Sequence, residues 1–163
     1  MSFILSAALL VAVVVVRPET AAIVRVPKDF RSVQAAVDAA KDGGIVILAM
    51  GVHAGPVDLR GKRITLKGEL GAEFTSLLGG NGVIQCVSGE GASTVIEGLT
   101  IAGGTGWQGE DGLRRGGGLY IDRASPIIRR CIIVGNEADR GGGVWIRGGV
   151  PLFEDCWFHD NIS

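Results

Sequence analysis

The chain has 163 residues, with 16 lysine and arginine residues, 17 aspartate and glutamate residues and a net charge of −1. This balance excludes a strongly basic nucleic-acid-binding protein and gives no electrostatic reason to expect an anionic membrane as partner. Glycine occurs 27 times, and the glycines cluster between short apolar runs. The composition therefore indicates one turn-rich domain rather than disorder.

The first 22 residues are predicted to be an export signal or a membrane anchor. Residues 3–16 are almost uninterruptedly apolar, and Arg17 and Pro18 end the run. The run is shorter than the about 20 residues of a spanning helix, which favours a cleaved signal. An uncleaved anchor and a misassigned start remain alternatives, because no lysine or arginine precedes the run. We expect the protein to be secreted or held in the cell envelope, with membrane contact only through this segment.

A short helix is predicted over about residues 31–41, with Asp29 or Ser32 as its N-cap and a glycine pair after its end. Its apolar residues recur at i, i+3, i+4 and i+7, which is the spacing of one helix face. These are Val33, Ala36, Val37 and Ala40. Short β-branched runs separated by glycines follow and are typical of strands. They occupy residues 45–48, 57–59, 64–67, 76–78, 83–87 and 94–101.

Residues 115–163 state one motif twice. The words GGGLYI and GGGVWI begin at Gly116 and Gly141, each is followed by a proline, a cysteine and an asparagine, and every matched pair is 25 positions apart. Residues 94–101 align with residues 126–133 at an offset of 32. The difference is absorbed by residues 105–114, a predicted loop that protrudes from one corner. A fixed period of this size predicts a solenoid of stacked β-coils.

Three stretches carry a resemblance to a known family: GGGLYIDRASPIIRRCIIVGN, GGGVWIRGGVPLFEDCWFHDN and SGEGASTVIEGLTIAGG. They resemble right-handed parallel β-helix proteins of the pectin-lyase-like superfamily, and VPKDFRSVQAAVDAAKDGGIVILAMGVHAG resembles the helix-capped start of that fold. The resemblance implies an all-β, right-handed, single-stranded parallel β-helix of about four coils over residues 23–163, with an N-terminal capping α-helix. The last coil has no cap, so we expect the chain to be the N-terminal part of a longer protein.

The alignment of coils assigns the two faces of each strand. Inward residues are expected to be Ile96, Leu99 and Ile101, then Ile128, Cys131 and Ile133, then Phe153, Cys156 and Phe158. Outward, Glu97, Arg129 and Glu154 are predicted to form a ladder of alternating charge that controls register rather than an active site. Asn136 and Asn161 resemble the asparagine ladders of the family.

The cysteines are Cys86, Cys131 and Cys156. Cys131 and Cys156 lie at equivalent places in adjacent coils, about 4.8 Å apart in a parallel sheet. Parallel side chains suit the dihedral angle of a disulfide badly, so we predict free thiols that pack as small apolar groups. With no CxxC motif and only two histidines, no metal site is predicted.

The best candidate for a binding site is the outward face that carries Tyr120 above Trp145 in sequence register and Asp122 beside Arg147. Aromatic rings next to charged groups suit a sugar chain, whose apolar face packs on rings and whose hydroxyls bond to charges. The loop with Trp107 is expected to form one wall. The alternative is an aromatic stack that only stabilises the sheet.

These observations lead to three functional hypotheses. The first is an exported β-helix scaffold with a polysaccharide-binding face; the second is the N-terminal part of a pectate-lyase-like or pectinesterase-like enzyme; the third is a structural or adhesive surface module. The superfamily resemblance implies no single activity. No catalytic motif of its enzymes is recognisable, so this chain alone is not predicted to be catalytic. No cofactor is predicted, and calcium enters only through the resemblance to pectate lyases.

Overall fold

The structure is a computed structural model that describes residues 21–163. The predicted export or anchor segment therefore lies outside the described residues, apart from its last two. Across residues 21–163, no helix is both long and apolar enough to span a membrane.

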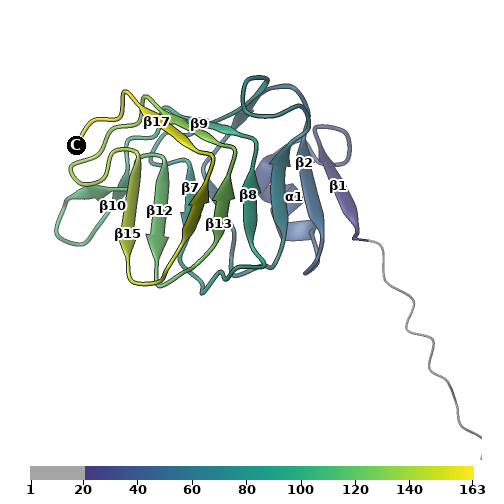
Figure 1. Ribbon diagram of the computed structural model, residues 1–163, viewed down its shortest axis with the longest axis horizontal. Coiled ribbons are helices and arrows are strands. Elements are labelled where there is room, and N and C mark those ends of the chain that lie inside the picture. Colours follow the sequence, from purple (N-terminus) through teal and green to yellow (C-terminus); the bar gives the residue numbers. More distant parts are fainter. Residues whose placement is uncertain (1–20) are drawn as a thin grey trace, which may run out of the picture.

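Short strands dominate the described part of the chain, with a single short helix near its start (Figure 1). The elements in chain order are β1 (Ile23–Val26), α1 (Val33–Ala39), β2 (Ile45–Leu48), β3 (Gly51–Ala54), β4 (Val57–Asp58), β5 (Thr65–Gly68), β6 (Thr75–Leu78), β7 (Ile84–Cys86), β8 (Val95–Glu97), β9 (Thr100–Ala102), β10 (Trp107–Gln108), β11 (Arg114–Arg115), β12 (Leu119–Asp122), β13 (Ile127–Arg129), β14 (Ile132–Val134), β15 (Val144–Arg147), β16 (Leu152–Glu154) and β17 (Trp157–His159).

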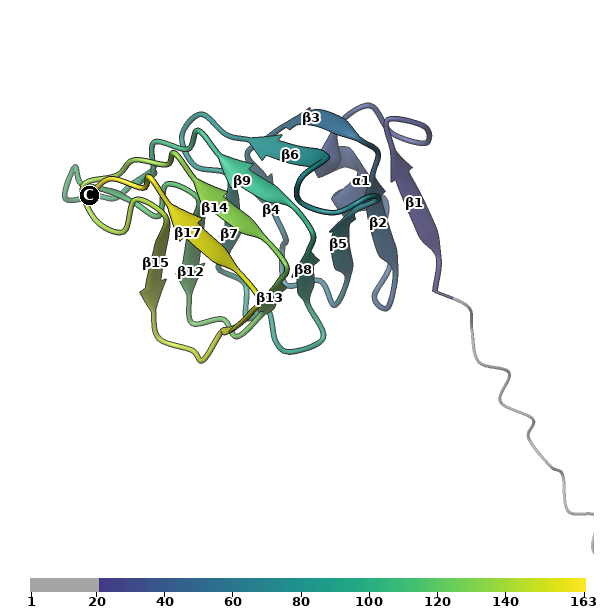
Figure 2. The same ribbon diagram turned by 45° about the horizontal axis from the view of Figure 1, so that its top comes forward.

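The strands stack into three parallel sheets that run the length of the molecule (Figures 1 and 2). The largest has the order β1-β2-β5-β8-β13-β16, the second β17-β14-β9-β6-β3 and the third β15-β12-β7-β4. Successive strands of one sheet come from successive turns of the chain, which is the arrangement of a parallel β-helix. Strands β10 and β11 form a separate antiparallel pair, and this pair fills the predicted loop insertion.

The register of the sheets confirms the repeat. Tyr120 pairs with Trp145, and Asp122 pairs with Arg147, 25 positions later. The offset of 32 between β8 and β13 is also observed, since Glu97 pairs with Arg129. Residues one period apart in sequence are thus neighbours along the axis of the fold.

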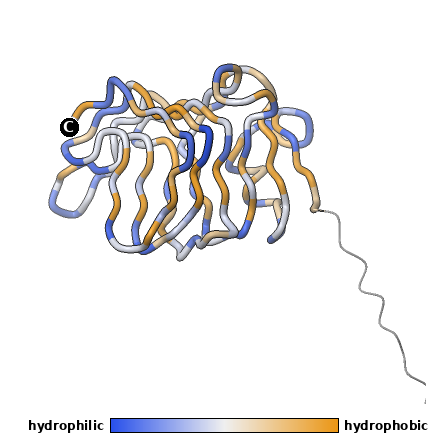
Figure 3. Tube along the Cα trace, in the orientation of Figure 1, coloured by the Kyte–Doolittle hydropathy of each residue, from blue (hydrophilic) through white to orange (hydrophobic). Residues whose placement is uncertain are grey.

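Inward residues form one continuous apolar core. The predicted inward residues of β8, β9, β13 and β14 are at most 1% exposed, as are Leu99 and Cys131. In the last turn, Phe153 and Cys156 pack against this core, whereas Phe158 keeps 45% of its surface exposed, because β17 has a neighbour on one side. Apolar residues accordingly follow the strands, and hydrophilic ones gather at the turns and in the hairpin loop (Figure 3).

Helix α1 is shorter than the predicted range 31–41. Ser32 is the N-cap, its Oγ accepting a hydrogen bond from Ala35 N at 3.2 Å, and Ala40 is the C-cap with extended backbone. Val33, Ala36 and Val37 are buried against β1, β2 and β4. The apolar stripe is as predicted, but one face of so few turns binds the sheet only between its caps.

An asparagine ladder fixes one bend of the coils. Asn136 is 1% exposed, and its Nδ2 donates to Ile101 O at 3.0 Å, to Val134 O at 3.1 Å and to Asn161 Oδ1 at 3.0 Å. Its Oδ1 accepts from Gly104 N at 3.0 Å. The predicted ladder is confirmed, and it satisfies backbone groups that the bend removes from the sheets.

Another bend repeats a left-handed backbone conformation rather than a residue type. Gly98, Arg130 and Asp155 occupy equivalent positions in three turns, with φ of 61°, 50° and 50°. Side chains other than glycine, asparagine and aspartate are uncommon in this region. The bend therefore imposes the torsion angle even where the chain supplies an arginine.

Two outward predictions differ in outcome. The Glu97–Arg129–Glu154 register is observed, but both Arg129 and Arg130 bind Glu97, with Arg129 Nε 2.9 Å from Glu97 Oε2. Across the described residues no ion pair joins Arg129 to Glu154, so the three-member ladder is wrong. Burial raises the pKa of Glu97, yet the hydrogen bonds from Arg129 and Arg130 outweigh it and lower that pKa. Cys86, Cys131 and Cys156 are free thiols, as predicted.

Candidate functional site

The outer face of the β15-β12-β7-β4 sheet brings the predicted site residues together. Alternate residues of β12 and β15 point inward, since Leu119 and Ile121 are fully buried. The residues between them, Tyr120 and Asp122, therefore face outward. Parallel pairing then places Trp145 next to Tyr120, and Arg147 next to Asp122.

Tyr120 and Trp145 form a stacked aromatic pair. Their ring centroids are 4.7 Å apart and the ring planes differ by 19°. The guanidinium carbons of Arg115 and Arg147 lie 5.8 Å and 5.6 Å from the centroid of the Trp145 ring, within cation–π range. The facing sides of the two rings are therefore occupied, and positive charge gathers beside the tryptophan.

Asp122 is held in place by Arg147. The carboxylate is 8% exposed and accepts from Arg147 Nε at 3.0 Å and also from Arg147 Nη2, and Arg123 Nε lies 3.5 Å away. The hydrogen bond from Arg147 lowers the pKa of Asp122, and the nearby charges of Arg147 and Arg123 add to this effect. The carboxylate is thus ionised at neutral pH and orients Arg147 at the edge of the aromatic stack.

The β10–β11 hairpin stands beside this face as a wall. Arg115 donates from Nη1 to Asp111 Oδ1 at 2.8 Å, and a second bond joins Arg115 Nη2 to the same carboxylate. This hydrogen bond lowers the pKa of Asp111 and raises that of Arg115. At the base of the hairpin, Arg114 N donates to Asp139 Oδ2 at 2.7 Å. These bonds fix the hairpin to the next turn of the fold.

Between the hairpin and the sheet lies a cleft of about 700 Å³. Its lining consists of Gln108, Gly109, Glu110, Asp111, Arg115, Tyr120, Arg140, Trp145 and Arg147. Arg115 and Arg147 have carboxylate partners, whereas in residues 21–163 neither Arg140 nor Glu110 takes part in an ion pair. We name this space the arginine cleft. Its polar groups that remain free to meet a ligand include one guanidinium and one carboxylate.

Four of the five predicted site residues meet at this place, and Trp107 does not line the cleft. Its indole lies against Gly82, where a Cβ atom would collide with the indole nitrogen. Nε1 of Trp107 is buried and has no hydrogen-bond partner among the described residues. The hairpin does form the wall, but through the residues that follow Trp107.

Arg115 and Arg140 are cleft residues that the sequence prediction missed. Both precede a glycine triplet at equivalent places in the repeat, and an isolated parallel bridge joins them. Their 25-residue spacing was the available signal. Within residues 21–163 no group of three histidine, cysteine, aspartate or glutamate side chains is placed to hold a metal ion.

Comparison with known proteins supplies a likeness of structure only. No protein-family model and no curated protein matches the sequence. The chain is similar to a crystal structure of a mutant pectin methylesterase in complex with a hexasaccharide, at 15% sequence identity and a TM-score of 0.62. The match covers 85% of this chain and 48% of that one, so the chain spans about half its length. The fold is thus the right-handed parallel β-helix of the pectin-lyase-like type.

Proposed function

We propose that this protein is an exported β-helix scaffold that binds an acidic polysaccharide in the arginine cleft. The observation that carries the proposal is the cleft itself, which combines an aromatic stack with three guanidinium groups. One of these, on Arg140, has no ion-pair partner in the described part of the chain. Arginine recognises carboxylates through a planar fork of donors, and uronic acids carry one carboxylate per sugar.

The stacked rings change how a sugar chain would be held. Tyr120 and Trp145 face each other at 4.7 Å, so a pyranose meets the outer edges of the rings rather than a free ring face. The C–H groups of the sugar pack there, and hydroxyl and carboxylate groups reach Arg140 and Arg147. We therefore expect the guanidinium groups to contribute more to affinity than the aromatic pair does.

Binding of hexagalacturonate, measured by calorimetry at low salt, tests the proposal. Arg140→Gln removes one charge-assisted hydrogen bond, so we expect affinity to fall about tenfold or more. Arg63→Gln is the matched control, because Arg63 is exposed and paired with Asp42 away from the cleft. Tyr120→Ala combined with Trp145→Ala should weaken binding further. Absence of binding, or equal loss in both arginine variants, would contradict the proposal.

A polysaccharide-modifying enzyme is the second candidate. It is favoured by the ionised Asp122–Arg147 pair next to the cleft and by the fold shared with a pectin methylesterase that was crystallised with a hexasaccharide. Methanol release from methylated pectin, lost in Asp122→Asn, would support an esterase. Unsaturated uronate formed from polygalacturonate in the presence of calcium would support a lyase. If neither activity nor binding is found, a structural or adhesive role is the remaining hypothesis.

A further inference from the structure

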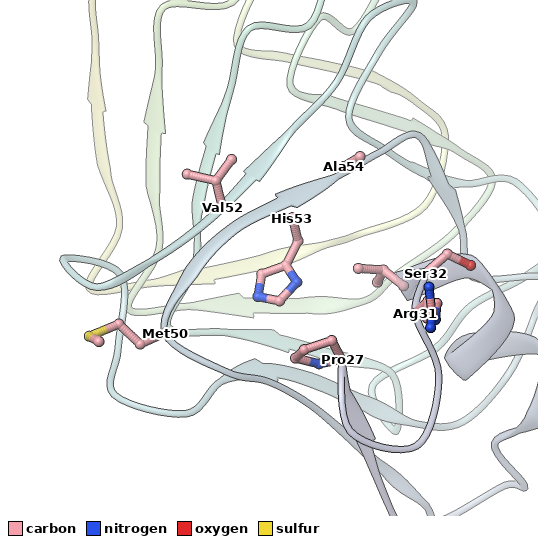
Figure 4. Close-up of a pocket in the computed structure, with 8 residues that line it drawn as sticks. Pro27, Arg31, Ser32, Met50, Val52, His53 and Ala54 are labelled. Atoms are coloured by element: carbon pink, nitrogen blue, oxygen red, sulfur yellow. The ribbon is translucent and has the colours of Figure 1, made fainter.

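A second cavity lies near the start of the fold, between the segment that leads into α1 and strand β3 (Figure 4). Its volume is about 300 Å³. It is lined by Pro27, Arg31, Ser32, Val33, Met50, Val52, His53 and Ala54. It shares no residue with the arginine cleft, so it is a separate place on the molecule.

Most of the lining is apolar, and part of that apolar surface is open to solvent. Met50 and Val52 keep 64% and 70% of their surface exposed, although both are large hydrophobic residues. They stand on either side of His53 in the close-up (Figure 4). This wall suits the hydrocarbon part of a ligand, because covering it removes apolar surface from water.

His53 breaks the pattern of the inward column to which it belongs. Parallel pairing continues that column through Leu77, Ile101 and Ile133, all of them fully buried. His53 is the polar member at the end of this column. Its Nε2 lies 2.8 Å from Ala49 O, and among residues 21–163 no partner is found for Nδ1. One ring nitrogen therefore fixes the imidazole, and the other remains for a ligand.

Positive charge at this cavity is not neutralised by its own lining. Arg31 contributes a guanidinium group that forms no ion pair in the described residues, and the lining contains no carboxylate. Ser32 Oγ accepts a hydrogen bond from Ala35 N, which leaves the hydroxyl hydrogen to donate. Arg31 and Ser32 together thus present several donors and no negative charge.

We propose that this cavity binds a small organic acid with an apolar body. The carboxylate is held by the planar fork of Arg31 and by Ser32, while the hydrocarbon part packs on Val33, Met50 and Val52. The volume is at the lower end of the range for ligand sites, roughly 300–1,000 Å³, which selects a single small molecule over an oligosaccharide.

The test is an NMR titration of the protein with hexanoate as probe and hexanamide as its uncharged match. Saturable shifts are expected at the His53 ring and at the Met50 and Val52 methyl groups. Arg31→Gln should weaken hexanoate binding about tenfold and hexanamide binding little. Arg31 is exposed and has no recorded partner, so this variant is expected to fold. Arg63→Gln carries the same change of charge at Asp42 and should leave both affinities unchanged.

His53→Leu provides an independent variant, since leucine is the residue that the next turn places in this column. It should keep the fold and reduce hexanoate affinity by removing the polar ring. Three results would overturn the proposal: no saturable shift at these residues, equal affinity for hexanoate and hexanamide, or an unchanged hexanoate affinity in Arg31→Gln.

Discussion

Replacing Asn136 with alanine tests how the bends hold the coils together. The substitution deprives three buried backbone groups of their partner: Gly104 N–H, Ile101 C=O and Val134 C=O. It also removes the bond to the Asn161 side chain. An orphaned buried donor costs about 1–3 kcal/mol, and the carbonyls add to this. We therefore expect the free energy of unfolding to fall by about 2–4 kcal/mol.

Urea denaturation followed by circular dichroism measures this loss. With a slope of about 1–3 kcal/mol per molar urea, the midpoint should drop by about 1–2 M. Asn81→Ala is the matched control, because Asn81 is exposed and should change stability by no more than about 0.5 kcal/mol. A loss below about 1 kcal/mol for Asn136→Ala, or a loss equal to that of the control, would refute the role given to the ladder.

Two further predictions concern the faces of the strands and the pairing of Asp122. Ile133→Asp places a charge in the core and should abolish soluble folded protein, whereas Ile132→Asp, one residue away on the outer face, should still fold; soluble expression and melting curves of the two variants decide, and a folded Ile133→Asp would show that the inward face is misassigned. The pKa of Asp122 is lowered in the folded state, so the contribution of its pair with Arg147 is fully present above about pH 4 and is lost as pH falls through the lowered pKa. The difference in unfolding free energy between wild type and Arg147→Gln should thus shrink from pH 6 to pH 3, and a difference that grows on acidification would contradict the pairing.

The sequence predicts those parts of the structure that follow from the period. The stack of Tyr120 on Trp145 and the pairing of Asp122 with Arg147 needed only the 25-residue spacing, because parallel register turns sequence offset into contact. The apolar core followed in the same way from alternation. At Phe158 the prediction of the inward face was right about direction but not about burial, since burial also depends on a neighbour along the stack.

Features that depend on non-repeating neighbours were beyond the sequence. Arg129 has Glu97 on one side and Glu154 on the other, both one coil away, and spacing alone does not select between them. Arg130 from the bend joins the same glutamate and tips the balance. Trp107 turned away from the cleft because Gly82, distant in sequence, offers room for its indole. No periodic pattern encodes either choice.

The bend shared by Gly98, Arg130 and Asp155 bears on how such a chain can be lengthened. Since the torsion angle recurs at this bend while the amino acid does not, the exchangeable part is a whole turn that starts and finishes in the same backbone geometry. A segment of 25 residues copied in tandem after this bend would meet its neighbours in the native register. Growth by duplication thus requires no new joint, and later divergence of the copies is restrained at the core and at the asparagine ladder more than at the bend.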